Sequence, residues 1–335
     1  MTPLRSSPFR LGFLTHFHGN LPVRELYPAL IDLFVAAEEL GFETGWVAQH
    51  HLQTLQGRLP SPLVFLAAVA ARTTRIRLGT ALTVLPLEDP LRLAEDAAVL
   101  EAISGGRLEL GLGTGGPSVE QFPAFGVDPA QRFTRYDAHK QRFLSILRGE
   151  ALPGDLRLEP AAPGLAATLW EAPSREDAVR QVAADGHGLL LGIGPARSVQ
   201  LPLAKAYHAA FRGTTPRIAA VRGAFPGASR EERASVLWHD VKRQLPAHRE
   251  AGWVSAHAGP HELLAAMNVQ YGTPEDLVGS LRADPVLPLS SDLILAVQSE
   301  QTTVKEAIRN AEIIARDVAP ALGWAAPQRE ELVHV

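Results

Sequence analysis

Residues 42–51 read Phe-Glu-Thr-Gly-Trp-Val-Ala-Gln-His-His, an apolar segment that stops at two adjacent histidines, His50 and His51. The pattern is typical of a buried strand. Side chains at the end of such a strand point into the cavity on which that end opens. Because imidazoles bind ligands and transfer protons near neutral pH, the two histidines are candidate functional residues. The structural alternative is a hydrogen-bonded histidine pair that closes the core.

Apolar segments alternate with amphipathic segments along the rest of the chain. In residues 25–40 the apolar positions recur at intervals of three and four, and Gly41 follows, as in a helix that ends at glycine. The sequence predicts strands over 11–14, 42–50, 76–84, 108–112, 167–170, 189–191, 218–221 and 293–297. It predicts helices over 25–40, 61–71, 90–103, 133–147, 175–184, 201–211, 230–244 and 304–318. Eight strand–helix units favour an α/β fold, the (β/α)8 TIM barrel with loop insertions; an open doubly wound sheet is the alternative.

Composition limits the class of function. The chain has 335 residues, of which 46% are hydrophobic and 20% charged, as in a soluble globular protein. A net charge of −4 gives no reason to expect a nucleic-acid partner, and no apolar run approaches the roughly 18 residues of a membrane span. The absence of cysteine excludes disulfides and thiolate metal sites. Residues 1–10 also lack the apolar core of a signal peptide, so we expect a cytoplasmic protein without a metal site or membrane association.

No linker or internal repeat divides the chain, so we expect one domain over residues 1–335. Residues 123–132 and 149–164 are rich in proline and glycine and are predicted loops. Residues 247–274 contain three histidines and only a short helical piece, and we interpret them as an insertion near the last strand.

A glycine-rich turn, Gly-Leu-Gly-Thr-Gly-Gly, follows the predicted strand at residues 111–116. A dinucleotide fingerprint is rejected because the turn comes after three strand–helix units and prolines prevent a long helix from starting directly after it. The remaining interpretation is that a planar ligand passes close to the backbone here. The alternative is a plain loop that needs positive φ angles.

Four segments in this order resemble the bacterial luciferase-like flavin monooxygenases. They are 46–51 (WVAQHH), 75–86 (RIRLGTALTVLP), 90–96 (PLRLAED) and 104–115 (SGGRLELGLGTG). Each segment alone is a weak signal, but their order and intervals are specific. The resemblance is strong over residues 11–147 and is recognisable again at 168–188, at 271–275 and in the last strand and helix. Residues 59–65 and 160–165 are most similar to the branch of FMN-dependent luciferase-like monooxygenases.

The resemblance implies a TIM barrel and a set of site residues. His50 matches the histidine implicated in proton transfer, although Gln49 replaces the glutamate of the family's motif. Because adjacent residues on a strand point to opposite sides, we expect only His50 to face the cavity and His51 to be mainly structural. Ala81–Leu82 matches a non-proline cis peptide under the flavin ring. Gly113 and Thr114 stand where luciferase has a cysteine and a phosphate-binding arginine, so Ser174 and Arg175 are the proposed replacements. The candidate cofactor-binding residues are therefore Thr15, His50, Ala81, Leu82, Gly113, Thr114, Ser174 and Arg175.

The resemblance also implies a reaction and partners. A separate flavin reductase would supply reduced FMN, which would react with O2 and a small organic substrate, with His50 as the catalytic acid–base group. Two alternatives remain open: hydride transfer by a deazaflavin, and a flavin-binding protein without catalysis. Relatives commonly pair through their second and third helices, and residues 63–71 are apolar on nearly every helical face, so we expect a homodimer.

Overall fold

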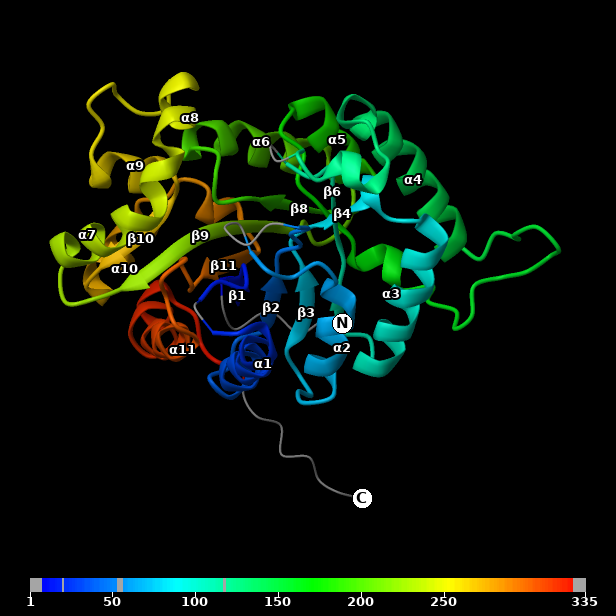
Figure 1. Cartoon of the computed structure of the whole chain (residues 1–335), viewed down its shortest axis with the longest axis horizontal. Coiled ribbons are helices and arrows are strands. Elements are labelled where there is room, and N and C mark those ends of the chain that lie inside the picture. Colours follow the sequence, from blue (N-terminus) through cyan, green and yellow to red (C-terminus); the bar gives the residue numbers. More distant parts are fainter. Residues whose placement is uncertain (1–7, 20, 53–56, 117–118, 328–335) are drawn as a thin grey trace, which may run out of the picture.

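Parallel strands form the inside of the molecule and helices surround them (Figure 1). The computed structural model describes residues 8–19, 21–52, 57–116 and 119–327. Within these residues the strands are β1 (Arg10–Thr15), β2 (Thr44–Val47), β3 (Arg77–Thr80), β4 (Thr83–Val84), β5 (Leu108–Glu109), β6 (Gly111–Gly113), β7 (Trp170–Glu171), β8 (Gly188–Leu191), β9 (Ile218–Pro226), β10 (Val269–Gly272) and β11 (Asp292–Ala296). The α-helices are α1 (Val23–Glu39), α2 (Pro62–Ala70), α3 (Pro90–Ser104), α4 (Arg132–Leu147), α5 (Glu176–Ala184), α6 (Arg197–Ala210), α7 (Arg230–Val241), α8 (Leu245–Glu250), α9 (Pro260–Ala266), α10 (Pro274–Arg282) and α11 (Val304–Ile313).

The strands close into a barrel although two of them are interrupted. β3 and β4 are halves of one strand, separated by Ala81 and Leu82, and β5 and β6 are halves of the next, separated by Leu110. β3 pairs with β5 and β4 with β6, so the hydrogen bonding continues across both interruptions. β1 pairs in parallel with both β2 and β11, which completes the ring. The predicted α/β TIM barrel is confirmed, and the open doubly wound sheet is excluded.

Two tryptophans fill the middle of the barrel. Trp46 on β2 and Trp170 on β7 are fully buried, with ring centroids 5.6 Å apart and ring planes at 89°. A Cβ atom added to Gly79 would lie 2.2 Å from the Trp46 ring, and one added to Gly188 would lie 2.3 Å from the Trp170 ring. The glycines on the neighbouring strands, β3 and β8, are therefore a packing requirement of the large rings. The barrel centre is solid, as in other folds of this class.

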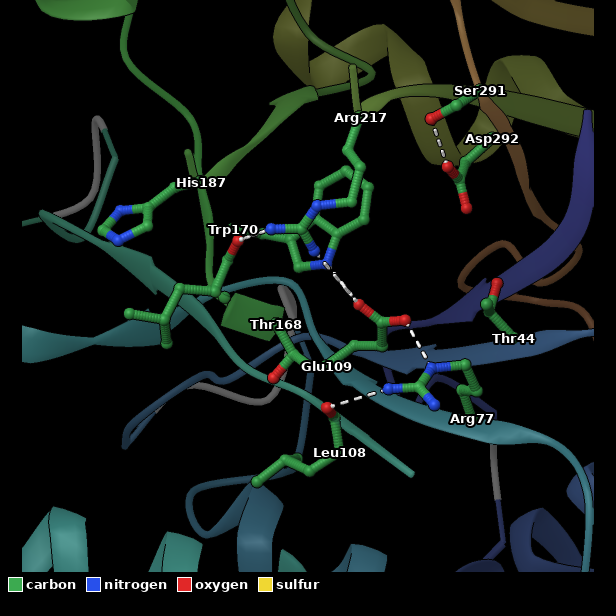
Figure 2. Close-up of polar contacts among 12 residues, drawn as sticks. Thr44, Arg77, Leu108, Glu109, Thr168, Trp170, His187, Arg217, Ser291 and Asp292 are labelled. Atoms are coloured by element: carbon green, nitrogen blue, oxygen red, sulfur yellow. Dashed lines mark hydrogen bonds and ion pairs between the residues drawn. The ribbon is translucent and has the colours of Figure 1, made fainter. Parts of the chain in front are cut away.

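A polar layer closes the N-terminal ends of the strands. Buried Glu109 accepts hydrogen bonds from Trp170 Nε1 at 2.6 Å and from Arg77 Nε at 2.5 Å (Figure 2). Arg10 bridges Glu109, at 2.9 Å, and Asp292, at 2.6 Å. Burial by itself would raise the pKa of Glu109, but the arginine charges and the tryptophan hydrogen bond lower it below its ordinary value. This end of the barrel is therefore held together by charged groups that stay ionised in the folded state.

The outer helices pack on the barrel through apolar stripes. α1 illustrates the pattern, since Phe34 lies edge-on against Phe13 of β1 at 4.8 Å and leaves no room for a side chain at Gly45. The buried positions of α1 are Leu26, Leu30, Leu33, Phe34 and Ala37, which belong to the predicted stripe. No helix in the described parts of the chain combines the length and the apolar character that crossing a bilayer needs.

Residues 245–282 hold more regular structure than the sequence predicts. They form α8, α9, β10 and α10, and β10 pairs in parallel with the C-terminal part of β9. The prediction of only a short helical piece was wrong for two reasons. Val269 and Tyr271 alternate with polar Gln270 over just four residues, which is too short a pattern to identify a strand. The start of α10 has a capping box, formed by Thr273 and Asp276, that the periodicity argument did not use.

We predict that Gly188→Ala destabilises the protein by about 1–3 kcal/mol, because the added methyl group overpacks the Trp170 ring. Gly164→Ala is the matched control, since a Cβ there meets no atom within 4 Å and the φ angle is not positive. Urea unfolding of both variants measures the effect. Equal unfolding free energies for the two variants would contradict the prediction, because they would show that the barrel centre accommodates the added methyl group.

Candidate functional site

A cavity of about 780 Å³ opens at the C-terminal ends of the barrel strands. Its floor is aliphatic and is formed by Leu14, Ala48, Leu190 and Val221, which also pack around the two central tryptophans. Pockets that bind small molecules have volumes of about 300–1,000 Å³, and barrel enzymes carry their active sites at this end. The cavity is therefore the candidate functional site.

The wall of the cavity contains the Ala81–Leu82 peptide, which is cis, as the resemblance implies. A Cβ atom added to Gly111 would lie 2.6 Å from Leu82 Cδ2, and one added to Gly113 would lie 2.8 Å from Leu82 Cδ1. These two glycines of the glycine-rich turn make room for Leu82. Gly115 and Gly116 have φ angles of +96° and +63°. At these two positions the glycine-rich turn is a loop that needs positive φ angles, which was the alternative interpretation of the sequence.

His50 and His51 both line the cavity. The prediction that only His50 faces it was wrong, because β2 ends at Val47 and the alternation of strand side chains does not extend to the histidines. His51 lies edge-on against Phe125 at 4.8 Å, and its Nε2 has no hydrogen-bond partner among the described residues. Burial lowers the pKa of His51, and Glu88 partly opposes this shift. His51 Nε2 is therefore a buried polar atom without a partner beside the cavity.

Gln49 replaces the glutamate of the resembling family and is buried. Its side-chain amide donates to the carbonyl of Pro60 at 3.0 Å and to Glu88 Oε1 at 2.9 Å. Its side-chain oxygen accepts from the Val84 N–H at 2.6 Å. A carboxylate could not donate to a carbonyl and to a second carboxylate. The amide therefore fits this position and ties the end of β2 to the segments that follow β4 and precede α2.

Two further histidines at the site were missed by the sequence reasoning. His16 lines the cavity, with Nδ1 3.2 Å from Nε2 of His50, and His18 stacks on His16 with ring centroids 5.7 Å apart. Burial, assisted by the neighbouring rings, lowers the pKa of His16 and of His50 to about 3 and that of His18 to about 4. All three imidazoles are therefore neutral at pH 7. The available signal was the segment Thr-His-Phe-His directly after the predicted first strand, the same kind of feature that identified His50.

A buried carboxylate, Glu171 at the end of β7, forms a second polar group of the cavity. It accepts from Tyr136 Oη at 2.6 Å, from Lys140 Nζ at 3.0 Å and from His187 Nδ1 at 2.7 Å. Burial alone would raise the pKa of Glu171, but these partners lower it to about 2. Burial and the Glu171 charge raise the pKa of Tyr136 well above its ordinary value. The sequence reasoning ended this strand at Trp170 and so did not consider Glu171.

Of the remaining predicted residues, all but Thr15 line the cavity. Ser174 and Arg175 line the cavity at the start of α5, but the exposed Arg175 guanidinium is already paired with Asp177, with Nε 3.0 Å from Oδ1. Thr15 is fully buried and does not belong to the cavity lining; its hydroxyl donates to Gln298 Oε1 at 2.7 Å. The other predicted cofactor-binding residues, all of which line the cavity, are His50, Ala81, Leu82, Gly113 and Thr114.

This combination of groups suits a flavin better than a metal ion. The aliphatic floor fits a planar ring, and Ser174 and Arg175 before α5 offer a hydroxyl and a guanidinium to a phosphate. Glu171, Asp185 and His187 are close enough to ligate a metal ion. Lys140 Nζ, however, lies 3.0 Å from Glu171 and 3.5 Å from Asp185, so an ammonium already supplies the positive charge there.

Comparisons with known proteins point to one family of enzymes. A family model described as luciferase-like monooxygenase matches residues 10–283. Uncharacterized protein y4wF of Sinorhizobium fredii is 34% identical over 212 residues, 60% of each chain. The 4-hydroxyprotoasukamycin monooxygenase of Streptomyces nodosus subsp. asukaensis is 43% identical over 122 residues, 36% of this chain and 32% of that protein. The matches thus span 60% of the first relative's length and less of the second.

Among solved structures, the oxygenating constituent of 3,6-diketocamphane monooxygenase from Pseudomonas putida has a similar fold. This type II Baeyer–Villiger monooxygenase, solved in complex with FMN, superimposes with a TM-score of 0.76 over 93% of this chain and 98% of its own. The sequence identity is 17%, so the likeness concerns the fold alone.

We predict that Glu171→Gln lowers stability by about 3–5 kcal/mol near neutral pH, because Lys140 loses the buried charge that it faces. The folded-state pKa of Glu171, about 2, lies below its ordinary value of 4.5. The carboxylate's contribution is therefore fully present above pH 4.5 and is lost as the pH falls toward 2. Urea unfolding of wild type and variant between pH 2 and pH 7 should show a stability difference that shrinks across this window.

Glu176→Gln, at an exposed position in the first turn of α5, is the control for this experiment. It removes the same charge without breaking a buried pair, so its effect at neutral pH should be small. A wild-type-minus-variant difference for Glu171→Gln that stays constant down to pH 2 would contradict the charge-based account.

Proposed function

Because this chain belongs to the luciferase-like monooxygenase family, we propose that it is a flavin-dependent monooxygenase that uses reduced FMN and O2 to oxidise a small organic substrate. The proposal depends most on one observation: the Ala81–Leu82 wall and the imidazoles of His50 and His51 face one cavity at the strand ends. Bound FMN would supply the oxygen-activating chemistry. The protein would bind and orient the reactants, exclude water and move protons.

The flavin ring would rest against the aliphatic floor and the Ala81–Leu82 wall. Ala81 contributes only a methyl group, so a planar ring can approach the backbone closely. A cavity of about 780 Å³ is large enough for a flavin together with a small substrate.

The FMN phosphate would be held at the start of α5. Thr114, Ser174 and Arg175 line the cavity and offer two hydroxyls and a guanidinium to the anion. Arg175 would have to exchange Asp177 for the phosphate, and both side chains are exposed. The net contribution of Arg175 is therefore the difference between two solvent-screened ion pairs, which is modest.

His50 would be the acid–base group of the reaction. It lines the cavity and is neutral at pH 7, because burial lowers its pKa to about 3. A neutral imidazole both donates a proton from one nitrogen and accepts a proton on the other. His50 can therefore serve a step that needs a proton donor or a step that needs a base without first becoming charged.

A separate flavin reductase would supply the reduced FMN in the cytoplasm. The structural neighbour described as an oxygenating constituent supports a division of labour between an oxygenase and a reductase. We also propose a homodimer formed through α2 and α3. The outward faces of these helices expose Val64, Val99 and Ile103, with 73%, 45% and 53% of their surface accessible, and such a contiguous apolar face suits a second copy of the chain.

A panel of flavins tests the proposal against its two alternatives. The full-length protein is titrated with reduced FMN and with a reduced deazaflavin, and oxygen consumption is then measured above the free-flavin background. Binding of reduced FMN with added oxygen consumption supports the monooxygenase. Preference for the deazaflavin indicates hydride transfer, and FMN binding without oxygen consumption indicates a non-catalytic flavin-binding protein.

We predict that His50→Ala lowers oxygen-dependent turnover by roughly 10²-fold or more, because general acid–base groups contribute at least that much. FMN affinity should stay within a few-fold, since the side chain contributes little to the apolar floor. His257→Ala, at an exposed position outside the cavity, is the matched control. Stopped-flow turnover and fluorescence titration give the two quantities. Wild-type turnover in His50→Ala would remove His50 from the mechanism.

We predict that Arg175→Ala weakens FMN binding by about tenfold and leaves riboflavin binding unchanged, because only FMN carries the phosphate that a charged hydrogen bond can hold. Arg180→Ala, in the same helix but outside the cavity lining, is the control. Isothermal titration with both flavins measures the effect. Equal losses for FMN and riboflavin would mean that Arg175 maintains the loop rather than the anion, and no loss would place the phosphate elsewhere.

A further inference from the structure

His16 and His50 meet where two neighbouring strands end. Thr15 pairs with Val47 in the parallel register of β1 and β2, so the residues that follow the two strands lie side by side. His16 Nδ1 is 3.2 Å from His50 Nε2, with the ring centroids 5.5 Å apart. At this distance one nitrogen donates and the other accepts, so the two rings share one N–H. The tautomer of each ring is thereby set by the other.

The loop that carries His16 is held firmly. Arg58 donates to the carbonyl oxygens of Gly19, at 2.5 Å, and Leu21, at 3.0 Å. Phe17 has a φ of +60° and buries its ring edge-on against Phe65. A non-glycine residue in the left-handed region persists where its surroundings over-determine it, and such residues gather at functional sites. The position of His16 is therefore specified by the fold.

Gly57 covers the contact between the two rings. A Cβ atom at this position would lie 2.3 Å from the His16 carbonyl oxygen and 2.5 Å from His50 Cδ2, and its φ of +148° also favours glycine. Any side chain here would push the imidazoles apart. Glycine at position 57 therefore permits the contact between His16 and His50, which a larger residue would disturb.

The surroundings keep both rings neutral. Burial lowers the pKa of each to about 3, and the charges of Arg58 and Arg243 lower that of His18, which stacks on His16. A neutral His50 that gives a proton to the cavity becomes an anion unless its second nitrogen gains a proton at the same time. His16 is the group in hydrogen-bond contact with that second nitrogen. His16 is therefore placed to give His50 Nε2 a proton, so that His50 stays neutral.

We infer that His16 is the proton-relay partner of His50 in the reaction proposed above and that it selects the His50 tautomer. In the donating direction, the His50 Nδ1–H bond breaks as a basic atom in the cavity takes the proton. The His16 Nδ1–H bond breaks as its proton passes to His50 Nε2. Water gives a proton to His16 Nε2 and leaves as hydroxide. Two N–H bonds break, two form, and both imidazoles end neutral; the reverse sequence lets His50 accept a proton.

The tautomer part is tested without flavin, by NMR of the imidazole nitrogens in the full-length ¹⁵N-labelled protein. Wild-type His50 should show one tautomer. His16→Leu should show both, since the partner nitrogen is gone, and His16→Met replaces it if the leucine variant does not fold. His139→Gln, half-buried on α4 outside the cavity lining, is the control and should leave His50 unchanged.

The relay part is tested by turnover with reduced FMN and O2. His16→Gln should lower turnover by roughly 10- to 100-fold while FMN affinity stays within a few-fold, because glutamine keeps the hydrogen bond but does not pass a proton. Wild-type turnover in His16→Gln overturns the relay, and a single unchanged His50 tautomer in the apolar variant overturns the coupling. If the wild-type protein shows no turnover, the proposed function and the relay fail together, while the NMR result still decides the tautomer coupling.

Discussion

The edge-to-face pair of Trp46 and Trp170 is the constraint on which the rest of the structure depends. Two indoles fill the middle of the barrel, and the cavity opens above them at the C-terminal ends of the strands. Their polar atoms are satisfied toward the other end, where Trp170 donates to Glu109 at 2.6 Å and Trp46 donates to Thr44 at 2.9 Å. The indoles therefore separate a charged, closed end of the barrel from a largely neutral cavity.

This separation gives the two ends opposite electrostatics. At the closed end, arginine side chains keep Glu109 ionised despite its burial. At the cavity end, burial keeps His16 and His50 uncharged. Of the two carboxylates that line the cavity, Glu171 and Asp137, Glu171 is paired with Lys140. The two imidazoles would therefore transfer protons through the N–H that they share rather than as charged groups.

Some features of the site could be predicted from the sequence and others could not. Strand ends are marked by polar residues after apolar runs, so His50 was identified, and the cis peptide at Ala81–Leu82 followed from the family resemblance. The same rule, applied to the first strand, would have found His16. Glu171 was missed because a one-residue error in the end of a strand excludes its last side chain. β10 was missed for a different reason, since alternation over four residues is too short to identify a strand.

The sequence by itself determined the eight strand–helix units, because periodicity, caps and breakers are properties of contiguous residues. Only the tertiary structure decided which strand ends meet. His16 and His50 are 34 positions apart, and Lys140 and Glu171 are 31 apart. Whether such residues touch depends on the register of neighbouring strands and on the closure of the barrel, and the pKa of each group then depends on the burial that closure produces.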